Sequence, residues 1–328
     1  MAWKITSEAQ LDSALPEIAA FWSEHVVTGT IPGVDDVPLA YAWCVPASPK
    51  GTVVISSGRI EAYLKYKEVI YDFYNNGFAV FIHDHRGQGL SGRMSENPHH
   101  GYVSSFDDYV ADLLLFIDNV VRVLAPEGPR YLLAHSMGAA IGVLTALRAP
   151  DAFERLVLCS PMFGIRPALP EWMTSALLNA SMRKHTRKGR QTGYFFGQRD
   201  YAPVPFNRNK LTHSQVRYGL FRQLYKENSS IQLGGVTVTW LKAAMSAMRE
   251  IENRIGGLSA PCLVLSAGAD EVVDNRKQIR VAGRLPMGSL HTISNARHEL
   301  LIETDDIRCP VMTLILDFLS EPLPTASL

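Results

Sequence analysis

The chain of 328 residues carries 32 Lys and Arg against 32 Asp and Glu, and 47% of its residues are hydrophobic. This composition excludes a disordered chain, a collagen-like rod and a disulfide-rich scaffold, because it provides ample apolar surface for a folded core. The formal net charge of zero also argues against a nucleic-acid-binding protein, so we expect no nucleic acid among its partners.

The ends and the cysteines of the chain indicate its compartment. The first residues lack the apolar run of a signal peptide, and no segment approaches the roughly 18 uninterrupted apolar residues of a membrane-spanning helix. The cysteines, at 44, 159, 262 and 309, are widely scattered without zinc-binding spacing, so we expect buried thiols and no metal. We therefore predict a cytoplasmic protein, and peripheral contact with a membrane stays open.

Short apolar runs alternate with helical patterns along most of the chain. After a helical segment at 7–27, the predicted strands are 52–57, 78–84, 130–135, 155–160, 261–266 and 289–293. The predicted helices between and after them are 61–76, 106–125, 137–149 and 308–320. Several strands are continuously apolar, as strands covered on both faces are. The alternation predicts an α/β fold with a mostly parallel sheet flanked by helices.

The alternation breaks between residues 163 and 245, where helical, basic and aromatic sequence replaces it. This segment holds 13 Lys and Arg against three Asp and Glu, so it carries a net charge of +10 and the remainder carries −10. We interpret the segment as an insertion rather than as a second domain in series. Residues 1–162 and 246–328 are then the core, which includes the helical segment at 7–27, and residues 163–245 are an inserted basic lid.

A candidate nucleophile follows the third strand of the core. The apolar run 130–135 leads directly into Ser136, and a helix of small residues begins behind it. This pattern is typical of a nucleophile elbow, a sharp strand-to-helix turn that exposes a serine oxygen at the edge of a sheet. The turn requires small neighbours, and Ala134 and Gly138 meet that requirement. The alternative is an ordinary serine at a helix N-cap.

A serine nucleophile needs a base and an acid to activate it. Strand 261–266 is followed by Asp270 and strand 289–293 by His298, so Ser136, an acid and a histidine occur in the order expected for this type of site. Each lies just beyond a predicted strand. Asp274 is an alternative acid, and we favour Asp270 because it lies closer to the end of its strand.

An oxyanion hole requires backbone N–H groups directed at the developing negative charge. The residue after the nucleophile supplies one of them, which here is Met137. The second donor is expected in the turn after strand 52–57, where Gly58 allows a close approach of the backbone and the N–H of Arg59 is our choice.

The sequence resembles an α/β-hydrolase of the monoacylglycerol lipase and bacterial lysophospholipase family over nearly its whole length. The segments that carry the resemblance are Gly33–Leu39, Gly58–Tyr66, Asp84–Arg93, Ala134–Gly138 and Ala296–Leu300, and in the insertion Leu211–Ser214 and Gly234–Trp240. The resemblance implies an α/β-hydrolase fold, a triad of Ser136, Asp270 and His298, a lid made from the inserted segment, and no cofactor.

The predicted lid combines large apolar side chains with basic ones. The candidate substrate-binding residues are Trp172, Phe195, Phe196 and Trp240 for an acyl chain, and Arg183 and Lys184 of the basic run 183–190 for an anionic head group or membrane surface. Alternatively, the apolar side chains pack the lid onto the sheet and the basic run is a solvated loop.

We therefore predict a serine carboxylic-ester hydrolase that releases a fatty acid from lysophospholipids or related single-chain acyl esters, without a cofactor. A neutral monoacylglycerol lipase or a broad carboxylesterase is the alternative among enzymes. A non-catalytic binding protein with a hydrolase fold is the alternative of another class. The sequence gives neither the oligomeric state nor the chain-length preference.

Overall fold

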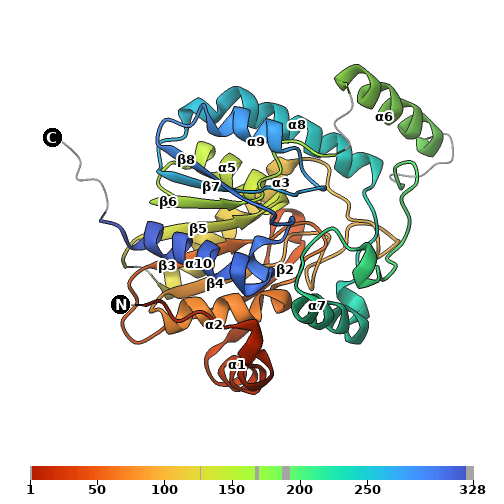
Figure 1. Cartoon of the computed structure of the whole chain (residues 1–328). Helices are drawn as coiled ribbons and strands as arrows, with labels where there is room; N and C mark the ends of the chain where they lie inside the picture. Colours follow the sequence, from red (N-terminus) through yellow and green to blue (C-terminus); the bar gives the residue numbers. More distant parts are fainter. Residues whose placement is uncertain (1, 126, 167–169, 187–192, 323–328) are drawn as a thin grey trace.

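The computed structural model describes residues 2–125, 127–166, 170–186 and 193–322, and shows one central sheet with helices on both faces (Figure 1). Within these residues the sheet has eight strands in the order β1-β2-β4-β3-β5-β6-β7-β8. β1 pairs with β2 and β2 with β4 in antiparallel orientation, and the other neighbours are parallel. The strands are β1 (Val27–Pro32), β2 (Pro38–Cys44), β3 (Thr52–Ser56), β4 (Ala79–His83), β5 (Arg130–His135), β6 (Arg155–Cys159), β7 (Cys262–Ala267) and β8 (Gly288–Ile293). The predicted α/β fold with a mostly parallel sheet is confirmed.

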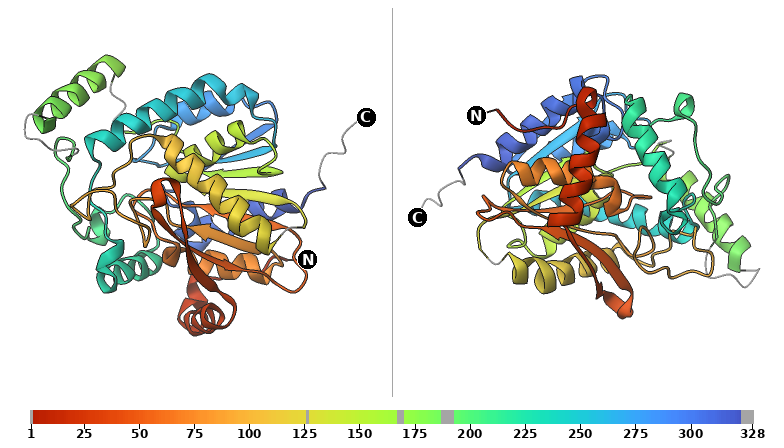
Figure 2. Two further views of the ribbon diagram at one scale, coloured as in Figure 1. Left: turned by 180° about the vertical axis from the view of Figure 1, so that it is seen from behind. Right: turned by 90° about the horizontal axis from the view of Figure 1, so that it is seen from below.

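Helices cover the sheet on both sides (Figures 1 and 2). One face carries α3 (Phe106–Phe116), α5 (Met137–Arg148), α8 (Val238–Arg254) and α9 (Asn275–Ala282), and α3 continues through a π-helical turn at Ile117–Val121 into α4 (Arg122–Leu124). The other face carries α2 (Lys67–Asn75) and α10 (Asp305–Ser320), with α1 (Leu11–His25) packed on α2. Short 3-10 helices lie at Glu8–Gln10, Val34–Asp36, Tyr63–Tyr66, Phe206–Arg208, Ser229–Ile231, Ile255–Gly257 and Leu300–Ile302.

The continuously apolar strands explain this layering. In β5, Leu132 and Ala134 belong to the hydrophobic cluster under α3, α5 and α8, while Tyr131 and Leu133 belong to the cluster under α2 and α10. Successive side chains of a strand point to opposite faces, so a strand that is covered on both sides must be apolar throughout. The two antiparallel strands β1 and β2 were not predicted, because β1 is mostly exposed and interrupted by glycine and proline.

The inserted segment lies at the end of the sheet away from the N-terminus, where α6 (Glu171–Thr186) and α7 (Gln215–Glu227) extend beyond the carboxyl ends of the parallel strands (Figures 1 and 2). α8 starts in this segment and runs on to Arg254 along α5, so the predicted boundary at 245/246 falls inside one helix. Residues 187–190 of the predicted basic run lie outside the described residues.

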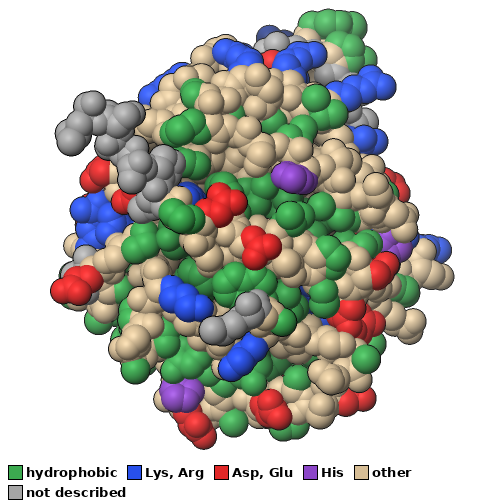
Figure 3. All heavy atoms as spheres, turned by 60° about the vertical axis from the view of Figure 1, so that its left-hand side comes forward, with side chains coloured by type: hydrophobic (Ala, Val, Ile, Leu, Met, Phe, Trp, Pro, Cys, Tyr) green, Lys and Arg blue, Asp and Glu red, His purple; other side chains and the backbone are tan. Residues whose placement is uncertain are grey.

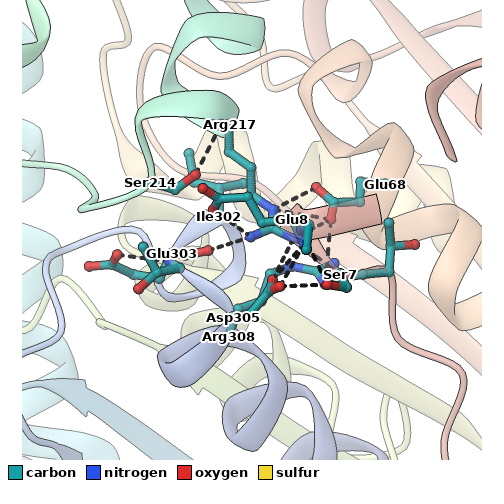
Figure 4. A network of polar contacts seen from close by, with 12 residues as sticks. Ser7, Glu8, Glu68, Ser214, Arg217, Ile302, Glu303, Asp305 and Arg308 are labelled. Atoms are coloured by element: carbon teal, nitrogen blue, oxygen red, sulfur yellow. Dashed lines mark hydrogen bonds and ion pairs between the residues drawn. The ribbon is translucent and has the colours of Figure 1, made fainter. Parts of the chain in front are cut away.

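One arginine fastens α7 to three separate parts of the core (Figure 4). Arg217 Nη1 donates to the backbone oxygen of Glu303 at 2.7 Å, and Nη2 donates to Glu68 Oε1 at 2.9 Å and Asp305 Oδ1 at 3.0 Å. Its Nη1 also lies 3.2 Å from Glu8 Oε2. These partners belong to α2, to the start of α10 and to the first 3-10 helix, so one buried guanidinium connects the insertion with both ends of the chain.

Three further observations concern the surface, the lengths of the helices and the cysteines. On the face that Figure 3 shows, acidic and basic side chains are scattered among apolar ones and form no continuous patch of one sign. No helix in the described part of the chain is long and apolar enough to cross a bilayer. All four cysteines are free, and three of them are buried, whereas Cys309 is half-buried.

Candidate active site

The chain makes a strained turn between β5 and α5, and Ser136 lies at its tip. Ser136 has φ 51° and ψ −113°, a backbone conformation that costs energy for any residue with a side chain. The turn presses against the end of β3, because a Cβ atom on Gly138 would lie 2.1 Å from the backbone oxygen of Ser56. Only glycine fits there, and the resulting geometry is that of a nucleophile elbow.

The structure brings Ser136, His298 and Asp270 together in one hydrogen-bonded line. His298 Nε2 lies 3.0 Å from Ser136 Oγ, and His298 Nδ1 lies 2.7 Å from Asp270 Oδ2. The three residues come from the loops after β5, β8 and β7, whose carboxyl ends meet at one edge of the parallel sheet. All three are buried, so the line is shielded from bulk water.

The surroundings of Asp270 keep its carboxyl group ionised. Burial acts to raise the pKa of Asp270, but the hydrogen bond from His298, the charge of His298 and two backbone amides lower the pKa below its ordinary value. Those amides belong to Val272 and Val273, which donate to Oδ1 at 2.7 and 3.1 Å. With Oδ1 occupied in this way, Oδ2 accepts from His298 Nδ1–H, which leaves Nε2 free to accept a proton from Ser136.

Asp274, the alternative acid, occupies a different position. It is the N-cap of α9, where its side chain accepts the backbone N–H of Arg276 at 3.0 Å. Among the described residues, no hydrogen bond joins Asp274 to His298. A helix cap is therefore the contact that the structure gives this carboxylate.

The backbone N–H groups of Arg59 and Met137 were predicted to form the oxyanion hole, and both residues line the cavity that contains Ser136. No hydrogen bond from the amide of Arg59 or of Met137 is found among the residues that the structure describes. Two hydrogen bonds fix the backbone next to Arg59. Gly58 N–H donates to Glu61 Oε2 at 2.5 Å, and Gln88 Nε2 donates to the Gly58 oxygen at 2.8 Å. A stiff loop with a free amide suits an oxyanion hole, whose donors must be oriented before the reaction.

A cavity of about 970 Å³ opens onto Ser136 and His298. Its walls come from the core and from the inserted segment, and their apolar side chains include Phe163, Ile165, Phe195, Trp240, Met245 and Met248. Three of the candidate substrate-binding residues line it, namely Phe195, Phe196 and Trp240. Trp172, Arg183 and Lys184 are exposed on α6 and are not among the lining residues.

A buried group of charges that the sequence analysis missed lies next to the cavity. Lys65 Nζ bridges Glu61 Oε1 at 2.5 Å and Glu299 Oε1 at 2.7 Å. His135 Nδ1 lies 3.2 Å from the same Glu61 oxygen, while His135 Nε2 lies 3.2 Å from the backbone oxygen of His298. Burial acts to lower the pKa of His135, but the two carboxylates raise it to about 9. The sequence did contain a signal for this cluster. Glu61, His135 and Glu299 each lie within three residues of a predicted site position, namely Gly58, Ser136 or His298.

The same group contains the atoms that could hold a metal ion in the described part of the chain, those of Glu61, His135 and Glu299. The Lys65 ammonium already lies between the two carboxylates and supplies the positive charge that an ion would bring. The donor set is therefore satisfied as an ion-pair cluster and does not fit a metal centre.

Comparisons with known proteins bear on the family and the fold of the chain. The sequence profile of the family described as "Serine aminopeptidase, S33" matches residues 47–305. "Lysophospholipase L2" of Escherichia coli (strain K12) is 36% identical over 323 residues, which cover 96% of this chain and 94% of the relative. "Monoglyceride lipase" of Mus musculus is 27% identical over 71% of this chain and 70% of its own length. A solved structure of a soluble variant of monoglyceride lipase from Saccharomyces cerevisiae has a TM-score of 0.70 at 16% identity, over 89% of this chain and 94% of that one. The chain therefore belongs to this family of serine hydrolases and has the α/β-hydrolase fold.

Proposed function

We propose that the protein hydrolyses the carboxylic ester of lysophospholipids or related single-chain acyl esters, with Ser136 as nucleophile, His298 as general base and Asp270 as the acid that orients His298. The observation that carries this proposal is the hydrogen-bonded line from Ser136 Oγ through His298 to Asp270 at the wall of a large apolar cavity. A weakly nucleophilic hydroxyl becomes reactive when a positioned base takes its proton, and this arrangement supplies one.

The first half-reaction acylates the enzyme. Ser136 Oγ attacks the ester carbonyl carbon while His298 Nε2 takes the hydroxyl proton. The carbonyl oxygen becomes an oxyanion, which accepts hydrogen bonds from the backbone N–H groups of Met137 and Arg59. The intermediate collapses by breaking the bond to the glycerol oxygen, which receives the proton from His298 Nε2. In the second half, water gives a proton to His298 Nε2 and attacks the acyl carbon. The bond between the acyl carbon and Ser136 Oγ then breaks, Oγ takes the proton from His298 Nε2, and the fatty acid is released.

We assign residues 163–245 to a lid over this site. The segment supplies Phe195, Phe196 and Trp240 to the cavity, and Arg217 anchors its helix α7 on the core. An apolar cavity of this volume suits a single fatty-acyl chain, because the chain and its ester group can both be buried in it.

Two observations bear on the substrate. The relative from Escherichia coli carries the name lysophospholipase and aligns over nearly the whole chain, and the lid segment is strongly basic, as an anionic head group requires. A neutral monoacylglycerol lipase is the second candidate, because the mouse relative is a monoglyceride lipase and the cavity walls are mostly apolar. The remaining alternatives are a broad carboxylesterase and an inert binding protein. The substrate panel and the labelling experiment below test them.

Labelling and turnover of the nucleophile variant test the mechanism. Ser136→Ala should abolish labelling by a fluorophosphonate probe and reduce ester hydrolysis by about 10⁴-fold or more. Ser160→Ala is the matched control, since Ser160 is also buried, follows the neighbouring strand β6 and has a positive φ. It should keep labelling and most activity. Hydrolysis by Ser136→Ala near the wild-type rate contradicts the mechanism, and an unlabelled wild-type protein identifies an inert pocket.

A substrate panel tests the specificity. We expect kcat/KM for lysophosphatidyl substrates to exceed that for monoacylglycerols of the same acyl chain at low salt. A preference for the neutral substrates under these conditions contradicts the lysophospholipase assignment and favours the second candidate.

We further propose that the protein acts in the cytoplasm and touches anionic membranes peripherally. Exposed Trp172 lies at the start of α6 and the basic residues Arg183 and Lys184 at its end, a combination suited to the charged boundary of a bilayer. Sedimentation with phosphatidylglycerol vesicles should exceed sedimentation with phosphatidylcholine vesicles and should weaken as salt is added. Equal binding to both vesicles contradicts the proposal.

A further inference from the structure

The side chain of Arg59 is enclosed beside the candidate active site, yet much of its hydrogen-bonding capacity is unused. Its Nη2 donates to the backbone oxygens of Gly234 and Gly235 at 3.0 and 2.7 Å. Nε is buried and has no acceptor in the described part of the chain, where the hydrogen bonds of the guanidinium all come from Nη2. The residue lines the cavity that contains Ser136.

The charge of this guanidinium is also unpaired. Within the described part of the chain no carboxylate lies at ion-pair distance from Arg59, and the same holds for Arg222 in the same cavity wall, whereas Lys65 and Lys277 are each paired with glutamates. Burial lowers the pKa of Arg59 to about 10, so the side chain is still protonated at neutral pH. A half-buried cation without a counter-charge is costly to the free protein, and an anion that binds to it offsets part of that cost.

The neighbours of Arg59 orient the guanidinium but do not neutralise it. The group lies 5.0 Å over the ring of Trp240, and a Cβ atom on Gly101 would come within 3.1 Å of Nη2. A side chain at 101 would therefore crowd the guanidinium. The guanidinium is thus held in one place by neutral groups, as a preorganised binding site requires.

The covalent length of the Arg59 side chain is comparable with that of a lysophospholipid between its ester and its phosphate. The backbone N–H of this residue is the proposed oxyanion donor, so the ester carbonyl would lie at one end of Arg59 and the guanidinium is at the other. In a 1-acyl lysophospholipid, the carbonyl carbon and the phosphorus are separated by the same number of covalent bonds as the backbone nitrogen and Cζ of an arginine. A planar guanidinium also offers paired donors to phosphate oxygens, which makes arginine well suited to this anion.

We infer that the Arg59 guanidinium binds the phosphate of the lysophospholipid head group while the backbone of the same residue holds the oxyanion. This inference rests on the proposed function. It also relocates the head-group site, which the sequence analysis assigned to Arg183 and Lys184, from the exposed end of α6 to the interior of the cavity. Specificity for a phosphate-bearing ester then comes from the loop after β3.

The test compares kcat/KM for 1-palmitoyl lysophosphatidylglycerol and 1-palmitoylglycerol, both as monomers below their aggregation concentrations. We call the kcat/KM for 1-palmitoyl lysophosphatidylglycerol divided by that for 1-palmitoylglycerol the ratio. For Arg59→Gln we expect this ratio to fall about 10- to 100-fold, because a hydrogen bond between charged groups is lost. Arg59→Lys keeps the charge without the paired donors, so it should restore part of the ratio.

Two matched controls remove a cation from the same cavity wall. Arg166 is exposed and its Nε donates to the backbone oxygen of Val273, and Arg222 lies over the rings of Tyr218 and Phe221 on α7. Arg166→Gln and Arg222→Gln should each change the ratio by less than about twofold, because neither charge is attached to the oxyanion loop. A change in either as large as that in Arg59→Gln means that only the general charge of the cavity matters, and it overturns the assignment.

The remaining outcomes separate this inference from the proposed function. If Arg59→Gln lowers kcat/KM for both substrates by the same factor, the side chain only fastens Gly234 and Gly235 to the loop, and the inference is wrong although the function stands. If the wild-type protein prefers 1-palmitoylglycerol, the lysophospholipase assignment on which the inference rests is wrong, and the second candidate function is favoured. A ratio restored by Arg59→Lys supports the inference, since a purely structural defect would affect both substrates alike.

Discussion

The role of the acid is best tested by comparing Asp270→Asn with Asp274→Asn. Asp270 Oδ1 accepts the amides of Val272 and Val273, and only Oδ2 faces His298. An asparagine at 270 would keep its oxygen on those two amides, because they are donors. Its NH₂ group would then point at His298 Nδ1.

That arrangement reverses the protonation of the histidine ring. Facing a donor, Nδ1 of His298 must act as the acceptor, so the proton moves to Nε2, which can no longer take a proton from Ser136. In serine proteases the equivalent change costs about 10⁴-fold in kcat, which corresponds to about 5.5 kcal/mol of activation free energy. We expect a loss of this size in Asp270→Asn.

Asp274→Asn provides the matched control. Its side chain caps α9 through the N–H of Arg276, and asparagine is an equally good N-cap, so activity and stability should change by less than about twofold and 0.5 kcal/mol. The assay is kcat/KM for a soluble short-chain ester, with thermal unfolding to confirm that both variants fold. A larger loss in Asp274→Asn, or an Asp270→Asn protein within tenfold of wild type, would refute the reasoning.

Two further predictions concern stability. Arg217→Met should lower the free energy of unfolding by about 3 kcal/mol, because it removes a buried guanidinium that pairs with Glu68 and Asp305 and donates to the backbone oxygen of Glu303. Chemical denaturation measures this loss, and Lys226→Met on the same helix is the exposed control. Equal effects of the two substitutions would contradict the anchoring role. His135, with a pKa raised from 6.5 to about 9, should stabilise the fold fully below pH 6.5 and lose this contribution as pH rises through 9. The difference in melting temperature between wild type and His135→Gln should therefore be largest near pH 6 and small near pH 10, and a difference that does not vary with pH would show that His135 is not charged in the fold.

Local sequence was sufficient for the architecture and for most of the elbow. The apolar runs from 52 to 160 predicted β3 to β6 to within two residues, because a strand buried on both faces has few compatible compositions. β1 was missed because an exposed edge strand places little constraint on its residues. β2 was also missed, although most of its residues are buried between β1 and β4. The order of Ser136, Asp270 and His298 at strand ends was informative because parallel strands bring their carboxyl ends to one edge.

The sequence by itself determined the family, the sheet and the neighbourhood of the site, all of which depend on periodicity and on residues close together in the chain. The tertiary structure decided what depends on contacts over long separations. It shows that Asp270 rather than Asp274 meets His298, that Lys65 lies between Glu61 and Glu299, and that Arg59 has no counter-charge among the residues that the structure describes. The zero net charge of the chain says nothing about this last point, because the desolvation of a single guanidinium depends on which distant residues surround it.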